Sequence, residues 1–257
     1  MKHEILNKLA EIETKEHVRV LHAVESGSRA WGVESPDSDY DVRFIYVRPE
    51  ADYLRVREKR DVIEWQLDEV LDINGWDLKK TLAQFHRGNA TLFEWANSPV
   101  VYKTTELWEK IYDVCRQYFS EKAALYHYCG TAKSTFLQYL QAETVNYKKY
   151  IYALRPLLAC RFMETYHRVP PVRFDELLRQ KLPDDLTGEI SGMLQVKTRS
   201  AESERNPSLP VIRKYIETEI DRYERLAKEM PDDRTHDWER LNQVFLRSLR
   251  ETEPARI

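Results

Sequence analysis

Patterns typical of β-strands occur only before Thr104 in this chain of 257 residues. Alternating or β-branched runs lie at 18–24 and 39–47, and a brief extended piece lies at 100–103. "DVIEWQLDEVLDING" reads as two short strands, with Asn74-Gly75 closing the second. Beyond Thr104 the apolar spacing is helical and turn signals are sparse. This order predicts an α+β chain in which a sheet comes first and a helical part follows.

Amphipathic helices are also expected around the sheet, over residues 1–16 and within "WDLKKTLAQFHRG" and "ATLFEWANSP". Later helices are expected at 104–119, 121–142, 144–168, 174–181, 184–199, 208–229 and 233–250. The predicted architecture is a small mixed β-sheet domain with flanking helices over residues 1–119, followed by an all-helical domain over residues 120–257.

Charge and cysteine usage exclude several classes of protein. The net charge of −3 excludes an overall basic nucleic-acid binder, although it leaves room for a local basic groove. Cys115, Cys129 and Cys160 are far apart, which argues against a zinc site and a disulfide framework and fits a reducing compartment. No apolar run approaches the ~18 residues of a membrane span, and the first residues lack a signal-peptide core. We therefore expect a cytoplasmic protein without a membrane partner.

Three aspartates stand at alternate positions in "ESGSRAWGVESPDSDYDVRFIYV", residues 25–47. Asp39 and Asp41 are two apart in a predicted strand, so both side chains project from one face and can share divalent cations. A third carboxylate from a neighbouring strand would complete a site for two Mg²⁺ or Mn²⁺ ions, about 3.5–4 Å apart. Asp72 in "VLDING" is the candidate for this third ligand, and Glu64 and Asp77 are the reserves.

A Gly-Ser pair precedes the aspartates by about a dozen residues, at the turn after the first strand. Gly27 lets the backbone approach a phosphate closely, and the Ser28 hydroxyl can donate to that phosphate. Arg29 adds a positive charge. Phosphate donors and metal ligands thus converge on one unit, which suits phosphoryl transfer from a nucleoside triphosphate.

The Gly-Ser and Asp-x-Asp arrangement, in a strand–helix–strand context, resembles the DNA polymerase β-like nucleotidyltransferase superfamily. The strings "LDINGWDLKKTL", "RGNATLFEWANSPVVY" and "KKYIYALRPLLACRF" are similar to its RlaP-type branch, predicted nucleotidyltransferases named for their association with RNA ligases. The resemblance extends from about Val18 to Glu219.

The resemblance assigns roles to individual positions. Gly27 and Ser28 match the phosphate-binding turn, and Asp39 and Asp41 match the two metal-binding carboxylates. Asp72 is the match for the third acid, which in that superfamily helps to activate the attacking hydroxyl. Because Ile-Asn-Gly and a further acid follow this position, Asp77 competes with Asp72 for the role.

In related enzymes a helical domain closes one wall of the nucleotide cleft, and Lys or Tyr side chains there contact the triphosphate. "NYKKYIYALRPLLACRF" places Lys148, Tyr152 and Arg155 close to one helical face, so these residues are the candidates. A solvated basic face remains the alternative. Pro156 is expected to kink or restart this helix.

The resulting expectation is a metal-dependent nucleotidyltransferase that moves a nucleoside monophosphate from ATP or another NTP to an acceptor hydroxyl and releases pyrophosphate. The acceptor is an RNA end, a small molecule or a protein side chain, and the branch name favours RNA processing. Whether the chain forms a homo-oligomer stays open. The alternative is a non-catalytic or antitoxin-like binding module of the same fold, although the presence of both Asp39 and Asp41 favours catalysis.

Overall fold

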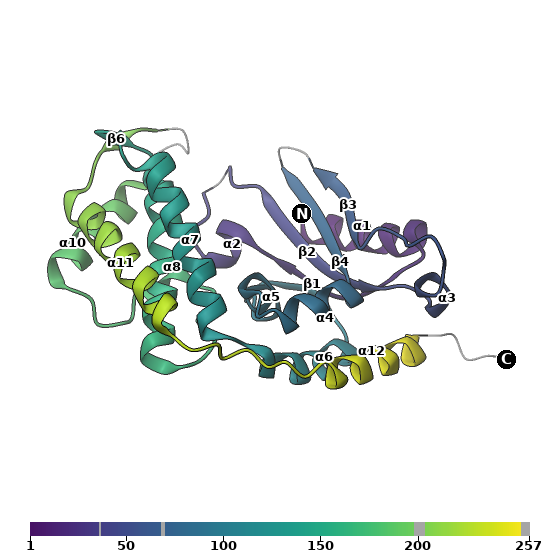
Figure 1. The fold of residues 1–257 in the computed structure, drawn as a ribbon. Coiled ribbons are helices and arrows are strands. Elements are labelled where there is room, and N and C mark those ends of the chain that lie inside the picture. The colour runs from purple at the N-terminus through teal and green to yellow at the C-terminus, as the bar shows by residue number, and fades with distance from the viewer. Residues whose placement is uncertain (36, 68–69, 198–203, 253–257) are drawn as a thin grey trace. The chain divides into compact units, whose positions relative to one another are not determined.

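A computed structural model describes residues 1–35, 37–67, 70–197 and 204–252 of the chain (Figure 1). Its first elements are α1 (Lys2–Glu16), β1 (Arg19–Glu25), α2 (Gly27–Trp31), β2 (Tyr40–Val47), α3 (Glu50–Tyr53), β3 (Val62–Leu67), β4 (Leu71–Asp77), α4 (Leu78–His86), α5 (Ala90–Ala96), β5 (Val101–Thr104), α6 (Glu106–Cys115) and the 3₁₀-helix η1 (Arg116–Tyr118). The later elements are α7 (Glu121–Tyr139), β6 (Thr144–Val145), α8 (Tyr147–Tyr166), α9 (Phe174–Leu177), α10 (Asp184–Lys197), β7 (Asn206–Pro207), α11 (Pro210–Glu229) and α12 (Glu239–Thr252).

The chain divides into two compact units. Unit 1 contains residues 1–31, 38–119 and the segment from Arg234 onward, and unit 2 contains residues 32–37 and 120–233. The sequence assigned everything after residue 119 to the helical domain. The structure corrects this assignment for α12, which belongs to unit 1 because it packs on α4 and α6.

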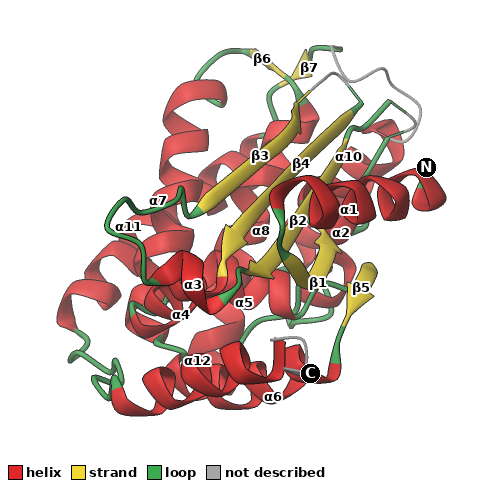
Figure 2. Ribbon diagram, turned by 90° about the vertical axis from the view of Figure 1, so that its right-hand side faces the viewer, coloured by secondary structure: helices red, strands yellow, loops and turns green. Residues whose placement is uncertain are grey.

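Unit 1 is built on a five-stranded sheet with the strand order β3-β4-β2-β1-β5 (Figure 2). β2 and β4 are parallel, and the other neighbours are antiparallel. Helix α1 contacts one face of the sheet, and α4 lies against β2 and β4. The apolar core beneath α1 includes Ile5, Leu9, Ile12, Val42, Phe44, Tyr46, Leu71 and Ile73.

Strand β4 runs straight through Asn74 and Gly75, where the sequence predicted the end of the strand. Gly75 lies directly opposite Phe44 of β2. A Cβ atom at Gly75 would stand only 2.2 Å from the Phe44 ring. The glycine therefore serves close packing inside the sheet, not a turn.

Unit 2 is helical, with α7, α8 and α11 packed together. Helix α8 continues through Pro156, which was predicted to kink or restart it, and almost all of its middle portion is buried. The sequence also predicted helix from residue 144, whereas Thr144–Val145 pairs with Asn206–Pro207 as a short β-bridge. Helix α8 starts only after Asn146, whose side chain accepts a hydrogen bond of 2.8 Å from the Lys148 amide as an N-cap.

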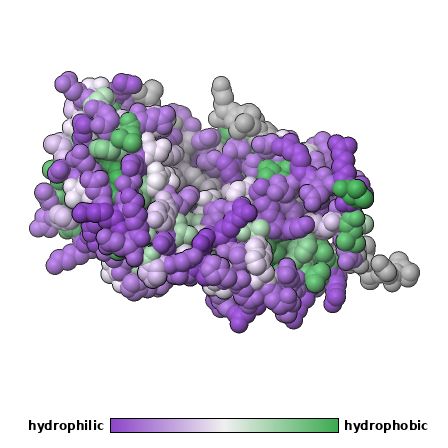
Figure 3. Space-filling model, in the orientation of Figure 1, coloured by the Kyte–Doolittle hydropathy of each residue, from purple (hydrophilic) through white to green (hydrophobic). Residues whose placement is uncertain are grey.

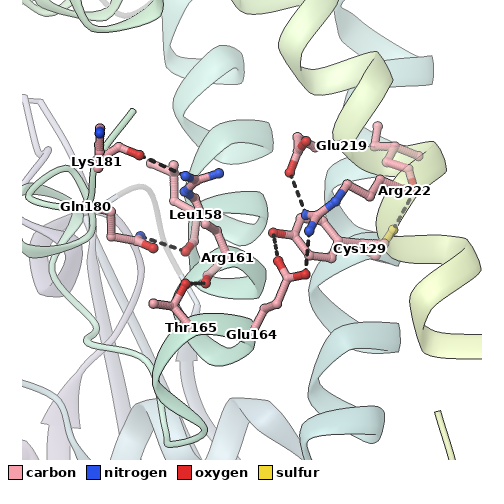
Figure 4. Close-up of polar contacts among 11 residues, drawn as sticks. Cys129, Leu158, Arg161, Glu164, Thr165, Gln180, Lys181, Glu219 and Arg222 are labelled. Atoms are coloured by element: carbon pink, nitrogen blue, oxygen red, sulfur yellow. Dashed lines mark hydrogen bonds and ion pairs between the residues drawn. The ribbon is translucent and has the colours of Figure 1, made fainter. Parts of the chain in front are cut away.

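Polar contacts tie the helices of unit 2 together (Figure 4). The Arg222 guanidinium on α11 forms ion pairs with Glu164 of α8 and, at 3.3 Å, with Glu219 of its own helix. The Gln180 amide donates to the Leu158 carbonyl at 2.9 Å, which holds the segment after α9 against α8.

The expected fold class is confirmed: a mixed sheet with flanking helices is followed by a helical unit. No described helix is both long and apolar enough to cross a membrane. The molecular face in Figure 3 is mostly hydrophilic, with small separate hydrophobic areas.

Candidate functional site

The parallel pairing of β2 with β4 places two carboxylates side by side. Asp41 is the register partner of Asp72, next to the start of both strands. Both side chains are half-buried, whereas the residues that follow them, Val42 and Ile73, point into the core beneath α1. Because side chains alternate along a strand, Asp41 and Asp72 lie on the opposite face of the sheet from α1.

A guanidinium group joins these two carboxylates. Arg43 Nη2 lies 3.1 Å from Asp41 Oδ1 and 2.6 Å from Asp72 Oδ2, and Nη1 donates to the Asp72 carbonyl at 3.1 Å. Two neighbouring carboxylates repel one another, so the cation between them offsets part of that repulsion. The alternation of β2 places Arg43 on the face of Asp41, but sequence reasoning gave this arginine no function.

Gly27 allows the turn after β1 to lie against Asp41. Its φ angle is +60°, a conformation that favours glycine, and a Cβ atom there would stand 2.1 Å from Asp41 Oδ2. The adjacent Ser26 amide donates to the Asp41 carbonyl at 2.8 Å. Ser28 follows in the five-residue helix α2 and is buried. Its contact with phosphate remains a prediction.

Glu25 and Tyr102 form a hydrogen-bonded pair that holds the backbone of Asp41. The sequence analysis identified neither residue. The Glu25 side chain is 1% exposed and accepts hydrogen bonds from the Asp41 amide, at 2.7 Å, and from the Tyr102 hydroxyl. Burial raises the pKa of the Glu25 carboxyl. The available signal was an acid as the last residue of an apolar strand, immediately before Ser26 and Gly27.

Arg29 organises the loop that carries Asp39. Its Nε donates to the Asp39 carbonyl at 3.0 Å, a second guanidinium nitrogen donates to the Ser38 carbonyl, and the group stacks 3.7 Å from the Tyr40 ring. The predicted strand began at Asp39, whereas β2 begins at Tyr40. The strand starts one residue later because the Ser38 and Asp39 carbonyls accept hydrogen bonds from the Arg29 side chain. Asp39 is exposed, and its role, like that of Arg29 toward phosphate, stays a prediction.

The two reserve carboxylates lie away from Asp41. Asp77 is five residues beyond Asp72, hence on the other face of β4, and is buried. It caps α4 by accepting from the Lys79 amide at 2.8 Å, and it accepts a hydrogen bond of 2.9 Å from the Tyr53 hydroxyl.

Burial raises the pKa of Asp77 to about 6. Glu64 is exposed and forms an ion pair of 3.1 Å with Arg60. Among the three predicted alternatives, Asp72 is the carboxylate next to Asp41 in the sheet.

The remaining predicted nucleotide contacts lie in unit 2. Lys148 Nζ stands 6.0 Å from the centroid of the Tyr152 ring, and both side chains are half-buried. Arg155 is 3% exposed, and its Nε donates to the Val172 carbonyl at 3.0 Å, which gives this guanidinium a structural role. The contact of all three residues with a nucleotide stays a prediction.

The donor set around Asp41 fits a divalent cation. Within the described residues, no three His, Cys, Asp or Glu side chains gather as a metal-binding group. Oxygens of Asp41 and Asp72 nevertheless converge on one cationic nitrogen of Arg43. Carboxylate oxygens are the ligands that Mg²⁺ and Mn²⁺ prefer. Asp41 and Asp72 could therefore hold such an ion, with Arg43 competing for the same oxygens.

The family that the chain matches agrees with the sequence resemblance. Residues 1–247 match RlaP, the RNA repair pathway DNA polymerase beta family. The uncharacterized protein YcgL of Bacillus subtilis (strain 168) is 39% identical over 253 residues, covering 98% of this chain and 97% of YcgL. The crystal structure of a nucleotidyltransferase-like protein from Exiguobacterium sibiricum 255-15 is 10% identical, with a TM-score of 0.30 over 99% of this chain and 81% of that chain.

Proposed function

The chain belongs to the RlaP family, the RNA repair pathway DNA polymerase beta family, and we propose that it is a metal-dependent nucleotidyltransferase. The observation that carries the proposal is the register of β2 and β4, which pairs Asp41 with Asp72. Gly27 brings a backbone turn within contact distance of the same Asp41 carboxylate. A turn of this type beside paired carboxylates suits the binding of phosphates and of divalent cations.

The proposed reaction transfers a nucleoside monophosphate from an NTP, with ATP as the first candidate, to an acceptor hydroxyl. The acceptor oxygen forms a bond to the α-phosphorus, and the bond from the α-phosphorus to the bridging oxygen breaks. Pyrophosphate leaves with that electron pair. Catalysis of such a transfer rests mostly on positioning and charge neutralisation, not on covalent chemistry with the protein.

Six residues of the site have a proposed role. The Ser28 hydroxyl donates to the outer phosphates, and Gly27 lets the backbone approach them. Asp41, Asp72 and Asp39 hold the divalent ions, which when bound neutralise phosphate charge. Asp72 also accepts the proton of the acceptor hydroxyl. Glu25 fixes the backbone of Asp41 through the hydrogen bond of 2.7 Å.

An RNA end is the acceptor that we propose, because the family is described by an RNA repair pathway. A small molecule or a protein hydroxyl remains the alternative acceptor. The negative overall charge requires that any RNA contact be local. Incubation with α-labelled NTP and separate pools of RNA, metabolites and protein identifies the acceptor from the fraction that gains label.

Substitution of the paired carboxylates tests the proposal. Calorimetry of the wild type should show NTP binding that requires Mg²⁺ or Mn²⁺. Asp41→Asn should weaken this binding at least about tenfold, because it removes a charged ligand. Asp72→Asn should abolish pyrophosphate release, because Asp72 is also the proposed proton acceptor. This variant should retain more of the NTP binding than Asp41→Asn does.

Asp113→Asn is the matched control, since this aspartate is 67% exposed on α6 and lies outside the site. It should leave binding and turnover unchanged. Metal-dependent NTP binding of normal affinity in Asp41→Asn would refute the proposed site. Metal-dependent binding that Asp41→Asn weakens, without transfer to any pool, would favour a non-catalytic binding module.

A further inference from the structure

A second polar site lies in unit 1, beyond the other end of β2. Asp41 stands near the start of this strand and Arg48 directly follows its end, so the two positions are about 20 Å apart along the strand. Two neighbouring cavities, of about 530 and 230 Å³, share Arg48, Glu58, Lys59 and Arg60 in their linings. The connection from β2 to β3 supplies most of their walls.

The larger cavity carries an excess of positive charge. Its basic lining residues are Arg48, Arg55, Arg57, Lys59 and Arg60, and its acidic ones are Glu16, Glu58 and Glu64. Lys59 and Arg55 both pair with Asp52, at 2.7 and 3.0 Å, so a single carboxylate serves two cations. Arg57 forms no ion pair or hydrogen bond with any described residue.

Arg48 provides an independent observation. The residue is only 6% exposed, and Nη1 donates to the Glu16 carbonyl at 3.2 Å. Its Nε is buried and has no hydrogen-bond partner among the described residues. Buried N–H groups are nearly always paired, and a charged one left alone is strongly unfavourable. Arg48 contributes to the lining of both cavities, so its positive charge is close to any anion bound in either of them.

We propose that this basic cavity binds a phosphate group of a ribonucleotide strand, at a site separate from the paired carboxylates. Arginine is well suited to phosphate because its fork of N–H groups matches the oxyanion. The cavity is larger than one phosphate requires. Leu54 and Val56, which alternate with Arg55 and Arg57, are 77% and 106% exposed and offer apolar surface beside the charges for a ribose or a base.

Removal of two exposed cations tests the site without disturbing the core. Binding is measured by calorimetry with inorganic phosphate and with a short oligoribonucleotide, with and without a 5′-phosphate. Arg57→Gln/Arg60→Gln should raise the Kd of the phosphate-bearing ligand at least about tenfold, because two charge-assisted contacts are lost.

The matched control is Arg116→Gln/Arg240→Gln. These arginines also belong to unit 1, are 62% and 61% exposed, and do not line either cavity. The control should change the Kd less than about twofold, although it removes the same net charge. An equal loss in both double variants would show general electrostatic attraction and overturn the site, as would unchanged binding in Arg57→Gln/Arg60→Gln.

Two further measurements locate the phosphate. Arg48→Lys keeps the positive charge but replaces the guanidinium fork with a single ammonium group, so it should weaken phosphate binding. Its melting temperature, measured alongside, separates a loss of binding from a loss of folding. A dependence on the 5′-phosphate would identify a terminal phosphate, whereas equal binding of both oligonucleotides would identify the backbone. The proposal does not require nucleotidyl transfer, so Asp41→Asn should retain phosphate binding at the cavity. Loss of all phosphate binding in Asp41→Asn would overturn it.

Discussion

Burial separates the environments of two aspartates on the same strand. Asp72 is half-buried beside Asp41, whereas Asp77 is 3% exposed on the other face of β4. The pKa of Asp77 rises to about 6 because burial disfavours its charged form. Since an unfolded aspartate titrates near 3.8, the folded protein holds this proton more tightly between about pH 4 and pH 6.

Asp77→Asn should therefore change the pH dependence of stability. Between about pH 4 and pH 6 the native state binds more protons at Asp77 than the unfolded state, so this group lowers stability as pH rises. The pKa change from 3.8 to about 6 corresponds to about 3 kcal/mol. Asparagine lacks the charge and can still accept the hydrogen bond from Lys79. Relative to wild type, the variant should gain stability by up to this amount over that range.

Urea denaturation of both proteins at pH 4, 5, 6 and 7 measures this difference. His22 has the opposite effect on the pH dependence of stability. Burial lowers its pKa to about 4, so the free energy of unfolding decreases as pH falls from about 6.5 to 4. His22 is present in both proteins, so its contribution cancels in the comparison. A stability difference that does not change with pH would contradict the buried, high-pKa state of Asp77.

At the level of secondary-structure elements, replacing two glycines by alanine is expected to have opposite effects on stability. Gly75→Ala should destabilise unit 1 by about 1–3 kcal/mol, because the added Cβ would stand 2.2 Å from the Phe44 ring. Gly130→Ala, within α7, should stabilise the protein by about 1 kcal/mol, because its Cβ meets nothing within 4 Å and alanine favours the helix. Urea denaturation followed by circular dichroism compares the two. Equal effects of both substitutions would rule out crowding at Gly75.

Most elements were predictable because their apolar spacing is local. The run at 18–24 corresponds to β1 (Arg19–Glu25), and "WDLKKTLAQFHRG" contains α4 (Leu78–His86). The pairing of β6 with β7 was missed, since two residues show no periodicity. Gly75 was taken for a turn because its function depends on Phe44, a residue more than thirty positions away.

The candidate site was only partly predictable for the same reason. Asp41 and Gly27 stand in a local motif, and Asp72 was the chosen candidate for a neighbouring strand. The sequence does not contain the register that sets Asp41 opposite Asp72. The contacts of Glu25 with Tyr102 and of Arg43 with both carboxylates depend on this register or on the position of β5, so no sequence spacing revealed them.

At the level of the whole molecule, the C-terminal segment returns to the first unit. The Trp238 ring stacks on His86 at 3.7 Å, and Phe245 of α12 meets Tyr53 edge-on at 5.0 Å. Leu241 and Leu249 of the same helix are buried, at 2% and 4% exposed. Unit 1 thus contains segments from both ends of the chain, and its stability depends on residues that follow the helical unit.

Leu241→Ala should destabilise unit 1 by about 2–5 kcal/mol, because it leaves a cavity between α12 and the helices on which α12 packs. Hydrogen exchange measured by mass spectrometry should show faster exchange in β1, β2 and α6. Exchange in α8 should stay unchanged, because α8 belongs to unit 2. Leu246→Ala is the control on the same helix: its side chain is 50% exposed, and the expected change is within about 0.5 kcal/mol. Faster exchange in α8 but not in β1 would show that α12 stabilises the helical unit instead, as the sequence alone had predicted.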